Sequence, residues 1–332
     1  MGSSDTFHVL FDAAHGQVNW AQTGFSSRQL NTNFAGLAAI FSELQCECSQ
    51  HTGRRLTKAL SGVDLLVIPP PTGAYNPLKE SWRPQLGSTF SSDEILEISR
   101  FVYHGGRLLA FAYRFGDSFT QTNLCELFAG FGVLLNNDAV INLNNIRRKN
   151  PLQSQFVTGP DCLSVPWEKK SFDRVFWRSM ATFIILPGAP AFPLAVSPGG
   201  RCIAWDRVFR QISFQSLPIL VAGTHGRGRF VLCGGPHVFE HGDFGLLHTA
   251  DNERLLRSVL RWLMTDEPVS QDTLDPRSAR MNSALAKSIN SNWQALCRLK
   301  GDGPDERFVN RVERQLRETG ILRAIGRARW SA

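Results

Sequence analysis

Patterns that mark common metal, phosphate and serine-hydrolase sites are missing from this sequence. Its seven cysteines form no C-x-x-C pair of the kind that zinc and redox sites use. It has no G-x-x-x-x-G-K-[ST] loop for phosphate and no G-x-S-x-G elbow for a nucleophilic serine. We therefore expect reduced, mostly buried thiols. Our first interpretation includes neither a metal nor a cofactor.

Long apolar runs are missing as well. No segment reaches the roughly 18 consecutive apolar residues that span a membrane. The opening Met-Gly-Ser-Ser-Asp does not have the charged-then-apolar order of a signal peptide. We expect no membrane insertion and a cytoplasmic location.

Positive charge is concentrated near the C-terminus. The net charge is +7, but residues 271–332 hold 12 Arg and Lys against 7 Asp and Glu, which leaves +2 for the first 270 residues. A nucleic-acid groove needs positive charge gathered over its binding face. The distribution argues against nucleic acid as a partner of the main domain. The arginines of the tail remain a weaker alternative contact.

Buried strands alternate with amphipathic helices in the first half of the chain. The helix expected over 91–103 begins with Ser91-x-x-Glu94, a capping box, and ends before two glycines. Such alternation predicts a flavodoxin-like α/β fold, with a mostly parallel sheet and helices on both faces. The strands expected here are 7–11, 63–68 and 108–112.

The second half is divided differently. Between about 142 and 217, prolines recur and short β-like runs replace helical periodicity, which indicates a β-rich insertion. A hairpin is expected from 219–222 and 229–233, around Gly226-Arg227-Gly228. We assign residues 1–268 to one α/β domain and 269–332 to a linker and a helical hairpin.

The two C-terminal helices expected after residue 270 have apolar stripes that need a cover. Three alternatives would cover the stripes: the helices fold back on the main domain, dock on a protein partner, or mediate self-association. The candidate partner-binding residues are Met281, Leu285, Ile289, Trp293, Phe308, Val312 and Leu316.

Ligands of open parallel sheets bind at the carboxyl ends of the strands. Asp12 and His15 follow the first expected strand, Tyr113 follows the third, and His237 follows the hairpin. These four are our candidate ligand-binding residues. One alternative is that the histidines only brace loops. Another is that Asp12, His15 and His237 hold a metal or an activated water in a hydrolase.

A nucleophile is missing from the place where this type of fold would present one. An amidotransferase of class I needs a cysteine at the sharp turn after a central strand. The corresponding stretch, residues 109–114, contains neither Cys nor Ser. We therefore expect a non-catalytic protein, a pseudoenzyme, and assign no catalytic residue.

Two segments resemble the GIFT domain, a class I glutamine amidotransferase-like (DUF4350-like) family. They are residues 131–140, Phe-Gly-Val-Leu-Leu-Asn-Asn-Asp-Ala-Val, and the run from Val231 through His237-Val238-Phe239 to 259–263. The domain heads a subunit of the intraflagellar transport complex and occurs in bacterial gliding-motility and transporter-associated proteins. The resemblance implies a binding or assembly role without catalysis.

Overall fold

One seven-stranded sheet forms the centre of the protein, in the order β12-β15-β16-β6-β3-β1-β2. Its strands are β1 (His8–Asp12), β2 (Glu47–His51), β3 (Leu65–Ile68), β6 (Arg107–Phe111), β12 (Ala191–Val196), β15 (Pro218–His225) and β16 (Gly228–Cys233). The computed structural model describes residues 6–15, 34–53, 56–71, 74–76, 81–83, 89–120, 122–143, 155–178, 180–199, 201–206, 212–241 and 245–265.

Five neighbouring strands of this sheet, from β2 through β1, β3 and β6 to β16, run parallel. The last two, β15 and β12, add antiparallel pairs. The β15–β16 hairpin is the one predicted, and Gly226 supplies the positive φ of +60° that its tight turn requires. The mostly parallel α/β fold is confirmed.

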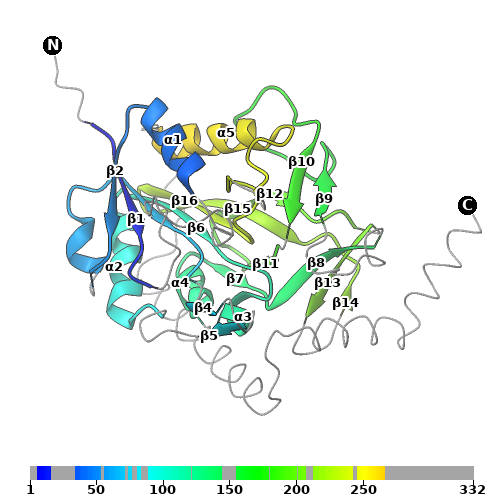
Figure 1. Cartoon of the computed structure of the whole chain (residues 1–332), viewed down its shortest axis with the longest axis horizontal. Helices are drawn as coiled ribbons and strands as arrows, with labels where there is room; N and C mark the ends of the chain where they lie inside the picture. The colour runs from blue at the N-terminus through cyan, green and yellow to red at the C-terminus, as the bar shows by residue number, and fades with distance from the viewer. Residues whose placement is uncertain are drawn as a thin grey trace, which may run out of the picture.

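Helices cover both faces of the sheet. Figure 1 shows α1 and α5 on one face, and α2 and α4 on the other. Alternate residues of β1 pack into two separate apolar clusters, Val9 and Phe11 into the first and Leu10 into the second. The helices are α1 (Ala35–Glu43), α2 (Ser92–Tyr103), α3 (Gly116–Thr120), α4 (Leu124–Ala129) and α5 (Asn252–Met264), with a 3₁₀ turn η1 (Leu56–Leu60).

The capping box expected at the start of α2 is present. The Ser91 hydroxyl accepts a bond from the Glu94 amide at 3.3 Å, and the Glu94 carboxylate accepts one from the Ser91 amide at 2.9 Å. Glu94 is buried, although glutamates are rarely buried without a partner. Its carboxylate therefore has a second role, which becomes clear at the candidate site.

Two arginines on neighbouring strands hold the C-terminal end of α5. Arg107 of β6 donates its Nε to the Leu263 carbonyl at 3.0 Å, and Arg229 of β16 donates to the Trp262 carbonyl. The last carbonyls of a helix lack intrahelical partners and carry partial negative charge. The two arginines supply hydrogen-bond donors and positive charge to these carbonyls, and they fix α5 to the centre of the sheet.

Small antiparallel sheets occupy the region between β7 and β15. β7 pairs with β11, β9 with β10, and β13 with both β8 and β14. β12 lies in the same stretch of sequence but joins the central sheet. The strands are β7 (Val133–Leu135), β8 (Asp138–Asn142), β9 (Gln155–Thr158), β10 (Val175–Arg178), β11 (Phe183–Ile185), β13 (Cys202–Asp206) and β14 (Ile212–Ser213).

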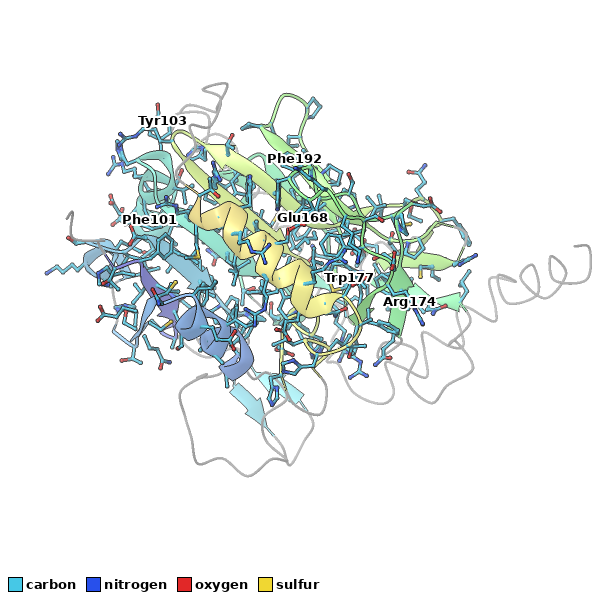
Figure 2. The ribbon with its side chains drawn as sticks, turned by 90° about the horizontal axis from the view of Figure 1, so that it is seen from above. Phe101, Tyr103, Glu168, Arg174, Trp177 and Phe192 are labelled. Carbon is cyan, nitrogen blue, oxygen red and sulfur yellow. The ribbon has the colours of Figure 1, made fainter. Side chains whose placement is uncertain are left out.

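An aromatic stack ties this region to α5. The Trp167 ring lies 4.6 Å from the Trp262 ring at 7° between planes, and Phe192 of β12 meets both rings edge-on. Trp167 also donates to the Ser258 carbonyl. Figure 2 shows Phe192 and the neighbouring Glu168 beside α5. Trp167 and Phe192 are therefore packed against α5.

Several sequence-based expectations lie outside the described residues, among them both C-terminal helices and their seven candidate partner-binding residues. After β3, the structure describes residues 69–71 and a short hairpin of β4 (Ala74–Asn76) and β5 (Ser81–Arg83). Within the described part of the chain, no helix has the length and apolar character needed to cross a membrane.

Candidate functional site

The four candidate residues lie at the carboxyl edge of the parallel strands. Asp12 is the last residue of β1, Tyr113 is two residues beyond β6, and His237 is four residues beyond β16. These three residues and His15, the fourth candidate, are all buried, with at most 8% of each residue exposed. They form two groups, because β3 separates β1 from β6 in the sheet.

His15 lies between two carboxylates. Its Nδ1 is 2.8 Å from Asp12 Oδ2, and its Nε2 is 3.4 Å from Glu94 Oε1. Burial lowers the pKa of the imidazole, but the hydrogen bond and charge of Asp12, with the charge of Glu94, outweigh it, so the pKa is raised above 6.5. Through these two contacts, the ring joins the end of β1 to the start of α2.

The surroundings of His15 are those of a structural brace. Its ring stacks on Phe90 at 3.9 Å and 25°, and the Asp12 Oδ1 atom accepts the Ala14 amide at 3.0 Å. Glu94 also accepts the Leu56 amide at 3.3 Å. Both ring nitrogens face carboxylates of the protein itself. The loop-bracing alternative thus accounts for Asp12 and His15 without a ligand.

His237 forms a second, separate pair with Glu240. His237 Nδ1 is 2.6 Å from Glu240 Oε2, and the Tyr113 ring meets the imidazole edge-on at 5.7 Å. Glu240 is 1% exposed, and its Oε1 has no hydrogen-bond partner in the described structure. A buried carboxylate oxygen without a donor is costly and rare in proteins. This oxygen is the strongest sign of a ligand contact at the sheet edge.

Positive charge lies beside this pair. Arg178, at the end of β10, interacts electrostatically with both Glu240 and Tyr113, although burial lowers the pKa of its guanidinium. Arg114 lies over the Tyr113 ring, with its Cζ 5.3 Å from the centroid. Burial raises the pKa of Glu240, and the charges of His237 and Arg178 oppose that rise. The group combines an imidazole, a phenol, a carboxyl and two guanidinium groups.

Sequence reasoning found His237 but missed the role of Glu240. Residues 237–241 read His-Val-Phe-Glu-His, which does not match the helical H-E-x-x-H pattern of zinc hydrolases. The structure has a turn there, and the contact that matters is His237 with Glu240, three residues on. The i, i+3 spacing in a tight turn was the available signal. No signal in the sequence pointed to Arg178, because this residue lies on β10, far from His237 along the chain.

The sharp turn between β6 and α3 is made by a phenylalanine. Phe115 has a φ of +62°, in the left-handed region that residues with a Cβ rarely adopt, and it is fully buried. Its ring packs edge-on against Trp205 at 5.4 Å. In a nucleophile elbow, a strained position of this kind carries the exposed reactive side chain. The turn at Phe115 lies one residue beyond the stretch 109–114 in which the sequence places the elbow. In this protein, the position holds the apolar side chain of Phe115, which is packed in the interior.

The Asn-Asn-Asp motif that the sequence singled out holds this turn in place. The Phe115 amide donates to the Asp138 carbonyl at 2.6 Å, and Asn137 Oδ1 accepts the Ser118 amide at 3.0 Å. The Asp138 carboxylate accepts both the amide and the hydroxyl of Thr182. Burial raises the pKa of Asp138 to about 7. The motif is therefore structural support for the turn after β6.

The cysteine nearest to this edge is not arranged as a nucleophile. Cys233 ends β16, is fully buried and donates its thiol to the Gly235 carbonyl. Burial raises its pKa to about 12, whereas reactive cysteines have lowered values. Among the residues that the structure describes, no three His, Cys, Asp or Glu side chains are grouped so that they could hold a metal ion.

Comparison with known proteins identifies the fold. Neither the comparison with protein families nor that with curated proteins gives a match. Among solved structures, the mmIFT52 N-terminal domain is similar over 79% of this chain and all of its own, with a TM-score of 0.56 and 20% identity. At that identity, the likeness shows a shared fold.

Two bacterial structures are more weakly similar. A cytoplasmic protein from Salmonella typhimurium LT2 matches 78% of this chain and all of its own, at 14% identity and a TM-score of 0.43. A putative ThuA-like protein from Bacteroides uniformis matches 81% of this chain and 95% of its own, at 11% identity and a TM-score of 0.43. The mostly parallel α/β arrangement that the sequence predicts is seen in the strand order of the central sheet itself.

The His15 brace predicts a pH dependence of stability. A raised imidazole pKa stabilises the fold fully below the unfolded value near 6.5 and ceases to do so as the pH rises through the folded value. At pH 5.5, His15→Gln is expected to lower the free energy of unfolding by about 1.5–3 kcal/mol, the range for a hydrogen bond to a charged group. The loss should shrink at pH 8.5. Urea unfolding at both pH values measures it.

The matched control for this experiment is His104→Gln, because His104 is exposed. It should change the free energy of unfolding little at either pH. An effect of His15→Gln that is equal at pH 5.5 and 8.5 would show that the charge on the ring contributes nothing.

Proposed function

We propose that this protein is a non-catalytic binding and assembly module, with a small-ligand site at the carboxyl ends of β6 and β16. His237, Glu240 and Tyr113 form the site, and Arg114 and Arg178 favour a ligand that carries an anionic group. The residues after 268 dock a protein partner or a second copy. We further propose that the chain is a GIFT-domain protein and that it acts in the cytoplasm.

The observation that carries the ligand proposal is the unpartnered Glu240 Oε1. His237 already occupies the other oxygen, and both side chains are buried. A pair that served only as a brace would gain nothing from an unsatisfied oxygen, which costs about 1–3 kcal/mol. Groups of this kind are retained where they meet a ligand. Asp12 and His15, which are satisfied by the protein, are supporting residues in this proposal.

The turn at Phe115 supports the absence of covalent catalysis. In covalent catalysis, a nucleophile at such a turn is activated by the imidazole of a His–carboxylate pair. Phe115 has no acid or nucleophilic group, and its ring is packed against Trp205. Among the described residues, the turn after β6 thus offers no nucleophile that His237 and Glu240 could activate.

A hydrolase that activates water directly is the second candidate. The specific observation in its favour is the His237–Glu240 pair itself, because a buried carboxylate can orient an imidazole as a general base. Turnover of ester or amide substrates that disappears in His237→Ala, and persists in His104→Ala, would favour this enzyme over the binding module.

The ligand proposal predicts that a small molecule is retained by the full-length protein. Small molecules extracted by denaturation and quantified by mass spectrometry should include one species present in wild type and reduced at least about tenfold in Glu240→Gln, since the amide has one oxygen where the carboxyl group has two. Glu97→Gln, an exposed glutamate on α2, is the matched control. Equal amounts in wild type and Glu240→Gln would contradict the proposal.

The assembly proposal predicts that the apolar stripes after residue 270 capture the partner. Changing Trp293 and Phe308 to serine should abolish co-purification of a partner from the native host, because truncating aromatic anchors commonly costs 2 kcal/mol or more, about thirtyfold in affinity. Affinity purification with quantitative mass spectrometry measures this. Ser291→Ala serves as a control. A partner that is retained by the double variant would place its docking surface elsewhere.

A further inference from the structure

The outer edge of β2 is an unpaired row of backbone groups. β2 is the last strand of the sheet and pairs with β1 alone, as Figure 1 shows. The Glu47 amide donates to Phe7 and the His51 carbonyl accepts from Ala13, so alternate residues face β1. Cys48 and Gln50 consequently direct their N–H and C=O groups outward. Within the described chain, these four groups have no hydrogen-bond partner.

The opposite edge of the sheet has features that block strand pairing, and among the described residues the edge of β2 has none of them. β12 contains Pro193, has two register shifts against β15 and forms an isolated bridge between Ala195 and Leu163. Prolines, bulges and covering segments are the devices by which proteins block edge pairing. β2 has the sequence Glu-Cys-Ser-Gln-His, without proline, lysine or a bulge. An edge of this kind accepts another strand.

We propose that β2 pairs antiparallel with β2 of a second copy of this chain, about a two-fold axis at Ser49. In this register, Cys48 lies opposite Gln50 of the partner subunit, and Gln50 lies opposite the partner's Cys48. Each such pair exchanges two backbone hydrogen bonds. Four bonds then join the two sheets into one, and the interface is isologous, as most homodimer interfaces are.

The side chains of Glu47 and His51 favour this register and a second copy of the chain as the partner. Glu47 then lies opposite the partner's His51, and the same contact occurs twice. The Glu47 side chain is 66% exposed, and the His51 side chain is half-buried, with its Nε2 atom buried. Shifting the register by two residues separates Glu47 from the partner's His51, and parallel pairing places the two glutamates together. Opposite charges across a strand pair stabilise it, and like charges destabilise it.

One contact within the protomer competes with this arrangement. Glu47 Oε2 is 3.3 Å from His8 Nδ1, and both side chains are largely exposed. Exposed pairs of this kind contribute little, so Glu47 can exchange partners. The β2 edge shares no residue with the ligand site or with the chain after residue 268, and the dimer does not depend on the proposed function.

The experiment is sedimentation of the full-length chain over a range of concentrations. Wild type is expected to show a monomer–dimer equilibrium. Glu47→Lys should weaken it at least tenfold, and Gln50→Pro should abolish it, because proline removes one outward N–H and leaves the bonds to β1 intact. The double variant Glu47→Lys, His51→Glu should restore the dimer, because it exchanges the charges. Glu97→Lys makes the same charge change on α2 and should have no effect.

Three results would overturn the proposal. They are a monomer at every concentration up to about 1 mM, a dimer that Glu47→Lys and Gln50→Pro leave unchanged, and a double variant that stays as weak as Glu47→Lys. The melting temperature of each variant is measured alongside, and Glu47→Lys, a change of an exposed side chain, keeps the test valid if Gln50→Pro does not fold.

Discussion

The parallel pairing of β6 with β3 and β16 is the constraint on which the rest of the structure depends. These strands are in register through buried backbone hydrogen bonds, so their ends lie at common edges of the sheet. At the amino edge, Arg107 and Arg229 are neighbours and together hold the end of α5. At the carboxyl edge, the same pairing brings Tyr113 and His237 into contact.

The same edge also separates residues that looked equivalent in the sequence. Asp12, His15 and His237 all follow strands, and their types suggested one shared site. The structure gives His15 two carboxylate partners of its own and gives His237 a different one. The first group closes the loop after β1, and the second keeps a buried oxygen without a donor. The position of these residues after strands thus predicted that they lie at one edge of the sheet. Their hydrogen bonds show that His15 braces a loop and that His237 belongs to the candidate site.

Local patterns predicted what is determined locally. The capping box at Ser91, the turn at Gly226 and the buried strands were all readable, because each depends on a few adjacent residues. The electrostatic interaction of Arg178 with Glu240, and the hydrogen bond of Asn137 to the turn at Phe115, join segments far apart in sequence. The periodicity of apolar residues in the sequence does not reveal such interactions. The left-handed conformation of Phe115 was also unpredictable, because that backbone region usually favours glycine.

The central claim is that His237 and Glu240 are kept for a ligand rather than for stability. The most direct test is the free energy of unfolding of the ligand-free double variant His237→Phe, Glu240→Leu, measured with urea. Replacing both partners of a buried polar pair by apolar groups can be neutral or stabilising, and it also removes the unsatisfied oxygen. We predict a free energy of unfolding equal to or above that of the ligand-free wild type. A loss of about 2 kcal/mol or more would show that the pair is a structural brace and would contradict the claim.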